Sequence, residues 1–161
     1  MAELTRKEVI AIVGVAGRYT RLAGVDLSGL DLSELNLYGI DLLGANLAKA
    51  KLQRTRLSKA EMGWANLAET NLEEAYLHEA NLVGADMSQA NLKGCALIDA
   101  CLIGVNLQGA DLRGALLSNA DLSGANLSVV RIDEKTEWPA GFDLIRHLGY
   151  SLGKEQENER I

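Results

Sequence analysis

The stretch NLVGADMSQANLKGCALIDACLIGVNLQGADL, residues 81–112, carries a leucine or a methionine at every fifth position. Two residues before each of them stands an alanine, a cysteine or a valine. An α-helix repeats its apolar positions about every 3.6 residues and a β-strand about every two, so a spacing of five indicates neither. The stretch therefore predicts a chain that turns a corner every five residues.

The same frame extends over most of the chain. It runs without a slip from Leu22 to Ile132, which gives 23 central positions, 20 of them leucine. The residue two before the centre is alanine at 13 of these positions, and glycine is common two after it. Glycine there suits the positive φ of a type II turn. We expect the centre and the small residue to point inward, and a period this short predicts a repeat architecture.

The repeat also points to a known family. Its pattern, A-(D/N)-L-x-x, is written in this chain as ADLRG, ANLSV and ANLAE and closely resembles the repeat of the pentapeptide repeat family. The resemblance implies an all-β solenoid, a right-handed quadrilateral β-helix with four pentapeptides per coil and nearly six coils. The segment EKTEWPAGFD also resembles the ending of many bacterial, especially cyanobacterial, members.

The two ends of the chain depart from the repeat, so we expect three regions. Residues 1–18 are predicted to form an N-terminal capping helix, because Thr5 and Glu8 have the spacing of a capping box. Its end is expected at Gly14 or Gly17. Residues 19–132 form the β-helix, and residues 133–161 a C-terminal cap with a short helix and a charged tail that we expect to be disordered.

Apolar side chains are expected to close both ends of the solenoid. The small positions of the first coil hold bulky residues, which fits an interior covered by a helix: Val25, Leu30, Leu35 and Ile40. At the other end Phe142, Ile145 and Leu148 are expected to cover the last coil.

Composition excludes several classes of function. The 161 residues carry a net charge of −6, with no segment basic enough to predict direct nucleic-acid binding. The longest apolar run, Val9 to Gly17, is too short to span a membrane and leads into the repeat, which disfavours a signal segment. Two cysteines without a secretory framework favour the cytoplasm.

Residues twenty apart should stack directly if four repeats make a coil. The expected stacks pair Lys49 with Glu69, Lys59 with Glu79, and place Arg54 between two glutamates. We interpret the basic residues near position 54 as partners in ion pairs and not as a nucleic-acid patch. Reversing the charge of Arg54 is expected to cost more stability than reversing that of Arg113. A second stack forms a polar ladder: Asp26, Asn46, Asn66, Asp86, Asn106 and Asn126.

One outward column is apolar instead of polar. Leu43, Val83 and Ile103 share it, and Trp64 projects from the neighbouring corner. On the adjoining face three more apolar residues are assigned outward: Tyr76, Ile98 and Leu116. Scattered exposed aliphatic side chains are normal, but a stripe joined to aromatic residues is typical of a contact surface. We treat these seven residues as a candidate protein interface, with surface drift as the alternative.

No residue pattern in the chain predicts catalysis, a cofactor or a metal. His78 and His147 are the only histidines, and neither lies near a plausible nucleophile. Cys95 takes an inward position and Cys101 an outward one, which argues against a disulfide and against a zinc site. We therefore expect that the protein is not an enzyme.

Three functions remain open. The first is a scaffold or interaction module that binds an unknown protein partner or forms a homodimer. The second comes from the resemblance, which includes gyrase-modulating members that imitate duplex DNA; it requires a continuous acidic wall. The third is a structural solenoid without a defined partner.

Overall fold

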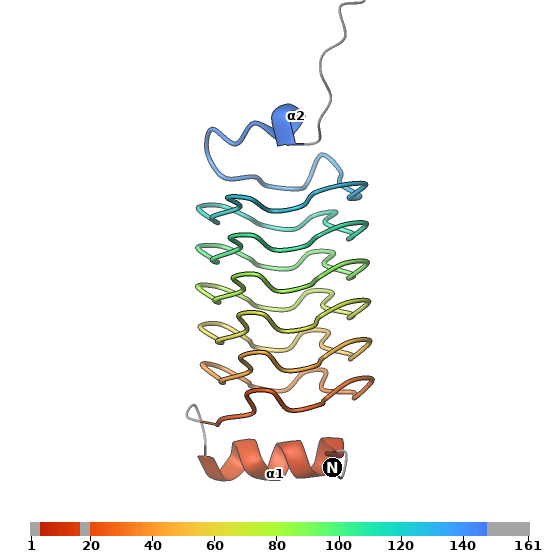
Figure 1. The fold of residues 1–161 in the computed structure, drawn as a ribbon, viewed down its shortest axis with the longest axis vertical. Coiled ribbons are helices and arrows are strands. Elements are labelled where there is room, and N and C mark those ends of the chain that lie inside the picture. The colour runs from red at the N-terminus through yellow and green to blue at the C-terminus, as the bar shows by residue number, and fades with distance from the viewer. Residues whose placement is uncertain (1–3, 17–19, 148–161) are drawn as a thin grey trace, which may run out of the picture.

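The computed structural model describes residues 4–16 and 20–147 and shows a column of stacked coils (Figure 1). The helix α1, Arg6–Ala16, lies across one end of the column. The short helix α2, Leu144–His147, lies at the other end. The charged tail predicted to be disordered, Leu148 and Gly17 all lie outside the described residues.

Parallel bridges join residues that are twenty apart, as the four-repeat coil requires. They begin at Arg21 with Asp41 and continue every five residues to Asp111 with Arg131. Each coil bonds to the next through its backbone: the N–H of Leu22 donates to the Asp41 carbonyl at 2.7 Å, and the N–H of Asp41 donates to that of Thr20 at 3.0 Å. The predicted twenty-residue period is confirmed.

Each corner of a coil is a tight turn. The N–H of Val25 donates to the Leu22 carbonyl at 3.2 Å, and the same bond recurs along the repeat. The residue two after the centre has a positive φ from Gly24 to Val129, as predicted. Twelve of these corner residues are not glycine, and for them the left-handed conformation carries a steric cost.

The interior is aliphatic and closely packed. The central residues from Leu22 to Leu127 are buried, and so are the alanines that stand two positions before the centres from Leu47 to Leu122. Burying one leucine contributes about 2 kcal/mol, so the inward columns dominate the stability of the fold. Cys95 lies in this core as predicted: its Sγ donates to the Ala75 carbonyl at 3.3 Å, and burial raises the pKa of its thiol.

Helix α1 packs on the first coil through side chains and through one arginine. The predicted capping box is present: the Thr5 N–H donates to Glu8 Oε2 at 2.7 Å, and the Glu8 N–H donates to Thr5 Oγ1 at 3.3 Å. Val9 is fully buried against the core. The Arg6 guanidinium donates to the carbonyls of Asp31 and Ser33. In the next coil the equivalent carbonyls accept N–H groups from the coil below, so Arg6 occupies acceptors on an otherwise unpaired sheet edge.

The frame of five ends after Ile132. The next bridge joins Leu116 with Glu137, which are 21 residues apart, so one extra residue is accommodated between 132 and 137. Asp133 fills the gap, because its Oδ1 accepts the Gly114 N–H at 2.9 Å where a backbone carbonyl would otherwise stand. Beyond it Trp138 and Phe142 stack with ring centroids 5.0 Å apart and pack against the core.

Two details of the ends differ from expectation. Helix α1 continues to Ala16, so Gly14 does not end it and lies inside the helix. Ile145 is 48% exposed, so it does not cover the last coil; the stacked rings of Trp138 and Phe142 pack there instead. Stacking of two flat rings buries more surface than one aliphatic side chain on a four-residue helix.

Candidate protein-binding surface

The solenoid has four walls, which we number in chain order by the bridge column on each. The first wall carries Arg21, Asp41, Glu61, Asn81, Cys101 and Asp121. The second carries Asp26, Asn46, Asn66, Asp86, Asn106 and Asn126. The third carries Asp31, Lys51, Asn71, Asn91, Asp111 and Arg131. The fourth carries Asn36, Arg56, Tyr76, Ala96, Leu116 and Glu137.

The first wall presents the predicted apolar column. Leu43, Gly63, Val83 and Ile103 follow one another in successive coils, because the N–H of each adjoining corner residue donates to the next of these carbonyls. Leu43 is 44% exposed, Ile103 is 40% exposed, and Val83 is half-buried. The Leu43 side chain folds over Gly63, with Cδ1 3.2 Å from where a β-carbon on that glycine would stand.

The corner between the first and second walls holds one large side chain among glycines. We call it the Trp64 corner; it consists of Gly24, Gly44, Trp64, Gly84, Gly104 and Gly124. Trp64 is 68% exposed and adopts a φ of 53°. Its indole lies over Gly84, where an added β-carbon would meet Nε1 at 2.8 Å. The glycine at 84 therefore leaves the space that the ring occupies.

The remaining three predicted interface residues lie on the fourth wall. Tyr76 is 47% exposed, whereas Ile98 and Leu116 are half-buried. The corner between the fourth and first walls holds Lys59 and Glu79, which form an ion pair at 3.1 Å. The structure therefore brings Leu43, Val83 and Ile103 together beside Trp64, but it separates them from the Tyr76 group by a charged corner.

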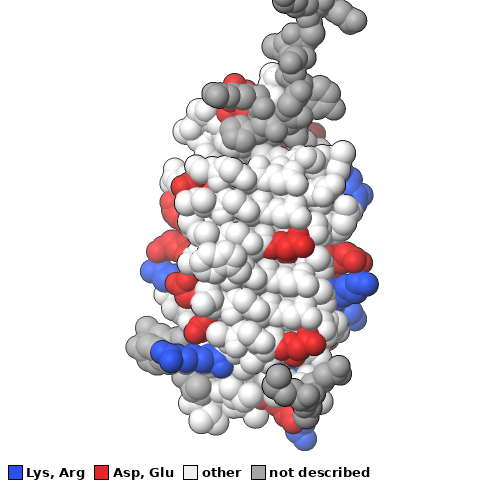
Figure 2. Space-filling model, viewed as in Figure 1, with Lys and Arg blue, Asp and Glu red and all other residues white. Residues whose placement is uncertain are grey.

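The second wall is flat and carries a ladder of amides. Asn46 Nδ2 donates to Asp26 Oδ1 at 2.9 Å, and Asn66 Nδ2 donates to Asn46 Oδ1 at 3.1 Å. A second set begins at Asp86, whose Oδ1 accepts from Asn106 Nδ2 at 3.0 Å. The face toward the viewer in Figure 2 is mostly uncharged, with a few separate acidic patches on it, and Lys and Arg lie toward its edges.

The predicted charge stacks are present. Lys49 and Glu69 are 3.6 Å apart, and the Arg54 guanidinium lies 2.8 Å from Glu74 and 3.7 Å from Glu34. All of these side chains are more than half exposed, so each pair contributes a few tenths of a kcal/mol. The hydrogen bond with Glu74 is the largest cause that raises the pKa of Arg54.

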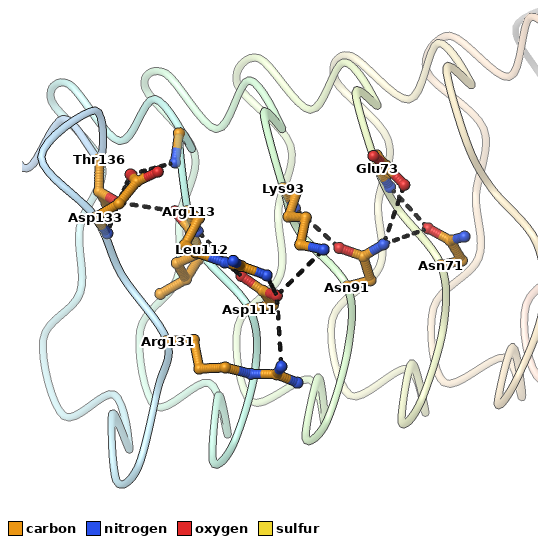
Figure 3. A network of polar contacts seen from close by, with 11 residues as sticks. Asn71, Glu73, Asn91, Lys93, Asp111, Leu112, Arg113, Arg131, Asp133 and Thr136 are labelled. Atoms are coloured by element: carbon orange, nitrogen blue, oxygen red, sulfur yellow. Dashed lines mark hydrogen bonds and ion pairs between the residues drawn. The ribbon is translucent and has the colours of Figure 1, made fainter.

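A network around Asp111 on the third wall was not anticipated (Figure 3). Arg113 binds Asp111 with two bonds, Nε to Oδ1 at 2.8 Å and Nη2 to Oδ2 at 2.7 Å. Lys93 lies 3.6 Å and Arg131 3.9 Å from the same carboxylate, whose side chain is only 6% exposed. The hydrogen bond from Arg113 is the largest cause that lowers the pKa of Asp111 to about 2. One sequence signal could have revealed this network. Asp111 stacks with Arg131, and Lys93 stacks with Arg113, because the members of each pair are twenty residues apart.

This network changes the order that we predict for two charge reversals. The stacked columns alone predict that Arg54→Glu costs more stability than Arg113→Glu. Arg54 is an exposed partner of exposed glutamates, whereas Arg113 is the bidentate partner of a carboxylate almost closed off from water. Losing the partner of a buried charge costs more than losing that of an exposed one.

The described residues contain no group of three or more His, Cys, Asp or Glu side chains that could hold a metal ion. Each carboxyl group with a shifted pKa has it lowered, as at Asp26, where the Ser28 backbone N–H is the largest cause. A general acid at neutral pH would need the opposite shift. Within 4–16 and 20–147, no helix is long and apolar enough to cross a lipid bilayer.

Comparison with known proteins gives one family. A family model described as pentapeptide repeats matches in eight copies over residues 20–58, 55–94 and 100–128. A search of curated proteins found no match.

Several solved structures of pentapeptide repeat proteins are similar to the chain. One from the thylakoid lumen of Arabidopsis thaliana is 30% identical, with 73% of this chain and 67% of that one covered and a TM-score of 0.48. Rfr23 from the cyanobacterium Cyanothece 51142 is 30% identical, with 80% and 96% covered and a TM-score of 0.29. One from Nostoc Pcc 7120 is 26% identical, with 92% and 96% covered and a TM-score of 0.35.

Proposed function

Because the chain belongs to the pentapeptide repeat family, whose members fold as right-handed quadrilateral β-helices, we propose that it is a non-enzymatic scaffold that binds a protein partner on its outer walls. The inward columns are nearly uniform leucine and alanine, so they specify shape and little else. What distinguishes this solenoid from any other must lie among its outward side chains.

The observation that carries this proposal is Trp64 on a corner otherwise made of glycine. A tryptophan 68% exposed, with Leu43, Val83 and Ile103 beside it, has the composition of an interface anchor and not of a solvated surface. Burying this cluster would contribute several kcal/mol, roughly 25 cal/mol per Å² of apolar surface.

Tyr76, Ile98 and Leu116 form a second, separate apolar surface on the fourth wall. We include it in the proposal as a contact for an additional partner, because the Lys59–Glu79 corner stands between it and the Trp64 corner. The half-buried state of Ile98 and Leu116 leaves them less apolar area to offer than Trp64.

A DNA-mimicking, gyrase-modulating role is the alternative. It requires a continuous acidic wall along the solenoid. The second wall has an amide at four of its six bridge positions, and the third wall carries three cations, Lys93, Arg113 and Arg131, around a single aspartate. A solenoid without a partner is the other alternative, and it leaves the exposure of Trp64 without a reason.

The finer architecture also belongs to this proposal. We assign nearly six coils to the 23 repeats, with α1 and the Trp138–Phe142 stack as caps that prevent end-to-end association of sheet edges. A cytoplasmic location is supported by two cysteines that are both free, one of them buried.

The test is a double substitution, Trp64→Ser with Ile103→Asp, both at outward positions. The expected result is an unchanged melting temperature with loss of partner capture from host lysate, or of a homodimer measured by light scattering. The matched control is Val15→Asp with Val129→Ser, which removes two exposed apolar side chains elsewhere. A double variant that keeps every partner and the oligomeric state of the wild type would show that the Trp64 corner is surface drift.

A further inference from the structure

The net negative charge of the solenoid lies on the two walls that meet at the Trp64 corner. Residues 20–132 contain nine basic and thirteen acidic side chains. The first and second walls hold one of the basic residues, Arg21, and five of the acidic ones: Asp26, Asp41, Glu61, Asp86 and Asp121. The other walls and corners of this segment therefore carry eight charges of each sign and are balanced.

The acidic side chains of these two walls are not neutralised. Most cations elsewhere on the solenoid are held in ion pairs, as Lys49, Arg54 and Arg113 are. None of the five carboxylates is within ion-pair distance of a cation on residues 4–16 or 20–147. They accept neutral donors instead: Asp41 accepts the Leu43 N–H at 3.1 Å, and Glu61 accepts Asn81 Nδ2 at 2.8 Å.

Trp64 and the apolar column beside it thus form an apolar centre, and the carboxylates of the first and second walls, which have no ion-pair partner, form a rim around it. Protein interfaces commonly combine a desolvated apolar core with a polar rim, and charge complementarity between the rims selects the partner. We propose that the Trp64 corner binds a basic, amphipathic protein segment whose apolar side chain packs beside Trp64 while its Lys and Arg side chains face the first and second walls. This inference rests on the proposed function and names the chemistry of the partner.

The same charges disfavour the other occupants. A second copy docked through this corner would bring two sets of unpaired carboxylates together, and like charges across an interface weaken association. A nucleic acid or an anionic lipid surface would be repelled for the same reason. Only a cationic partner gains from both the apolar centre and the rim.

The probe for this inference is a synthetic helix-forming peptide of about 14 residues with Leu and Lys at amphipathic spacing. Two matched peptides carry Glu or Gln in place of every Lys. The reporter is Trp64 fluorescence in the full chain with Trp138→Phe, together with calorimetry on the wild type. We expect the Lys peptide to shift the Trp64 emission to the blue and its affinity to fall about tenfold from low to high salt, and the Glu peptide to leave Trp64 unchanged. No shift with the Lys peptide would overturn the inference.

A pair of charge variants separates this site from general attraction to an acidic protein. The wall variant replaces the five carboxylates by amides: D26N, D41N, E61Q, D86N and D121N. Asn already stands at equivalent places in other coils, as at Asn46 and Asn81, so the fold is expected to tolerate these changes. The control variant removes five acidic charges elsewhere: E34Q, E69Q, E73Q, E79Q and D99N.

We expect the wall variant to lose about tenfold or more in affinity for the Lys peptide, while the control variant stays within about twofold of the wild type. An equal loss in both variants would show general electrostatic attraction and would overturn the inference. Retained partner capture by the wall variant combined with loss in the Trp64→Ser, Ile103→Asp variant would refute the basic partner alone and leave the proposed function standing. Retained capture in both would refute both.

Discussion

The outer surface of the solenoid divides into two halves that share one backbone. The third and fourth walls and the charged corners beside them hold the ion pairs of the coils, including the Arg54 ladder and the Asp111 network. The first and second walls hold unpaired carboxylates and the Trp64 corner. Arg54 and Trp64 occupy corners with almost the same φ, 54° and 53°. The backbone conformation of a corner therefore does not depend on its side chain, and the two halves differ in their side chains alone.

The largest effect is expected in the paired half. Arg113→Glu should lower the free energy of unfolding by about 2–3 kcal/mol, because it leaves the nearly buried Asp111 beside a second carboxylate. Arg54→Glu should lower it by about 1 kcal/mol, and less in high salt, since its partners are exposed. Urea unfolding of both variants at low and high salt measures the difference. Equal costs would mean that the burial of Asp111 has no energetic weight.

Asp111 should also give the paired half a distinct response to acid. Its pKa is held at about 2 in the folded protein, below its ordinary value of 3.8, so its charged form stabilises the fold above about pH 4 and this contribution disappears as the pH falls toward 2. The stability advantage of the wild type over Asp111→Asn should be roughly 1–2 kcal/mol at pH 6 and should shrink below pH 4. Unfolding curves of both proteins from pH 2 to 6 provide the measurement, and a constant difference would contradict the prediction.

The packing of the Trp64 corner is tested by two glycines at the same backbone conformation. Gly84→Ala should cost about 1.5 kcal/mol, because the left-handed φ is unfavourable for alanine and the new methyl group displaces the indole. Gly104→Ala should cost about 1 kcal/mol, since nothing lies within 4 Å of its β-carbon. Thermal unfolding and Trp64 fluorescence report both effects. In a Trp64→Ser background the two costs should become equal; a persistent difference would mean that the indole is not the cause.

The smallest expected effect is an increase in the free energy of unfolding. Val129 is a β-branched residue at a φ of 51°, and its side chain is 74% exposed, so it gives little packing in return for the strain. Val129→Gly should raise the free energy of unfolding by about 0.5–1 kcal/mol. Val15→Gly, in the last turns of α1, is the contrasting change and should destabilise by a similar amount. A lower melting temperature for Val129→Gly would contradict this account of the corner.

The repeat part of the fold could be predicted from sequence because every coil obeys the same rule. Once the period of five is found, the buried columns, the positive φ at the corners and the pairs such as Lys49 with Glu69 follow from counting in steps of twenty. Counting in steps of twenty no longer predicts the contacts after Ile132, where the five-residue repeat ends. The extra residue before Glu137 and the use of Asp133 as a carbonyl substitute depend on how one irregular segment meets the last coil.

The candidate surface was predictable in part. Column position correctly places Leu43, Val83 and Ile103 on one wall, but it does not show that the Trp64 indole leans over Gly84. Nor does it show that Arg113 reaches back to Asp111, because long side chains choose among several neighbours in adjacent columns. Which neighbour a long side chain contacts depends on the three-dimensional packing, so counting along the sequence does not predict it.

The most direct test of the central claim is a footprint of the bound partner. Hydroxyl-radical oxidation of side chains is measured with and without the partner that the wild-type protein captures. It compares Trp64 in one half with Tyr76 in the other, both of which are well exposed. If the Trp64 corner is the binding surface, the oxidation rate of Trp64 should fall severalfold on complex formation while that of Tyr76 stays unchanged. Protection of Tyr76 with Trp64 still freely oxidised would contradict it.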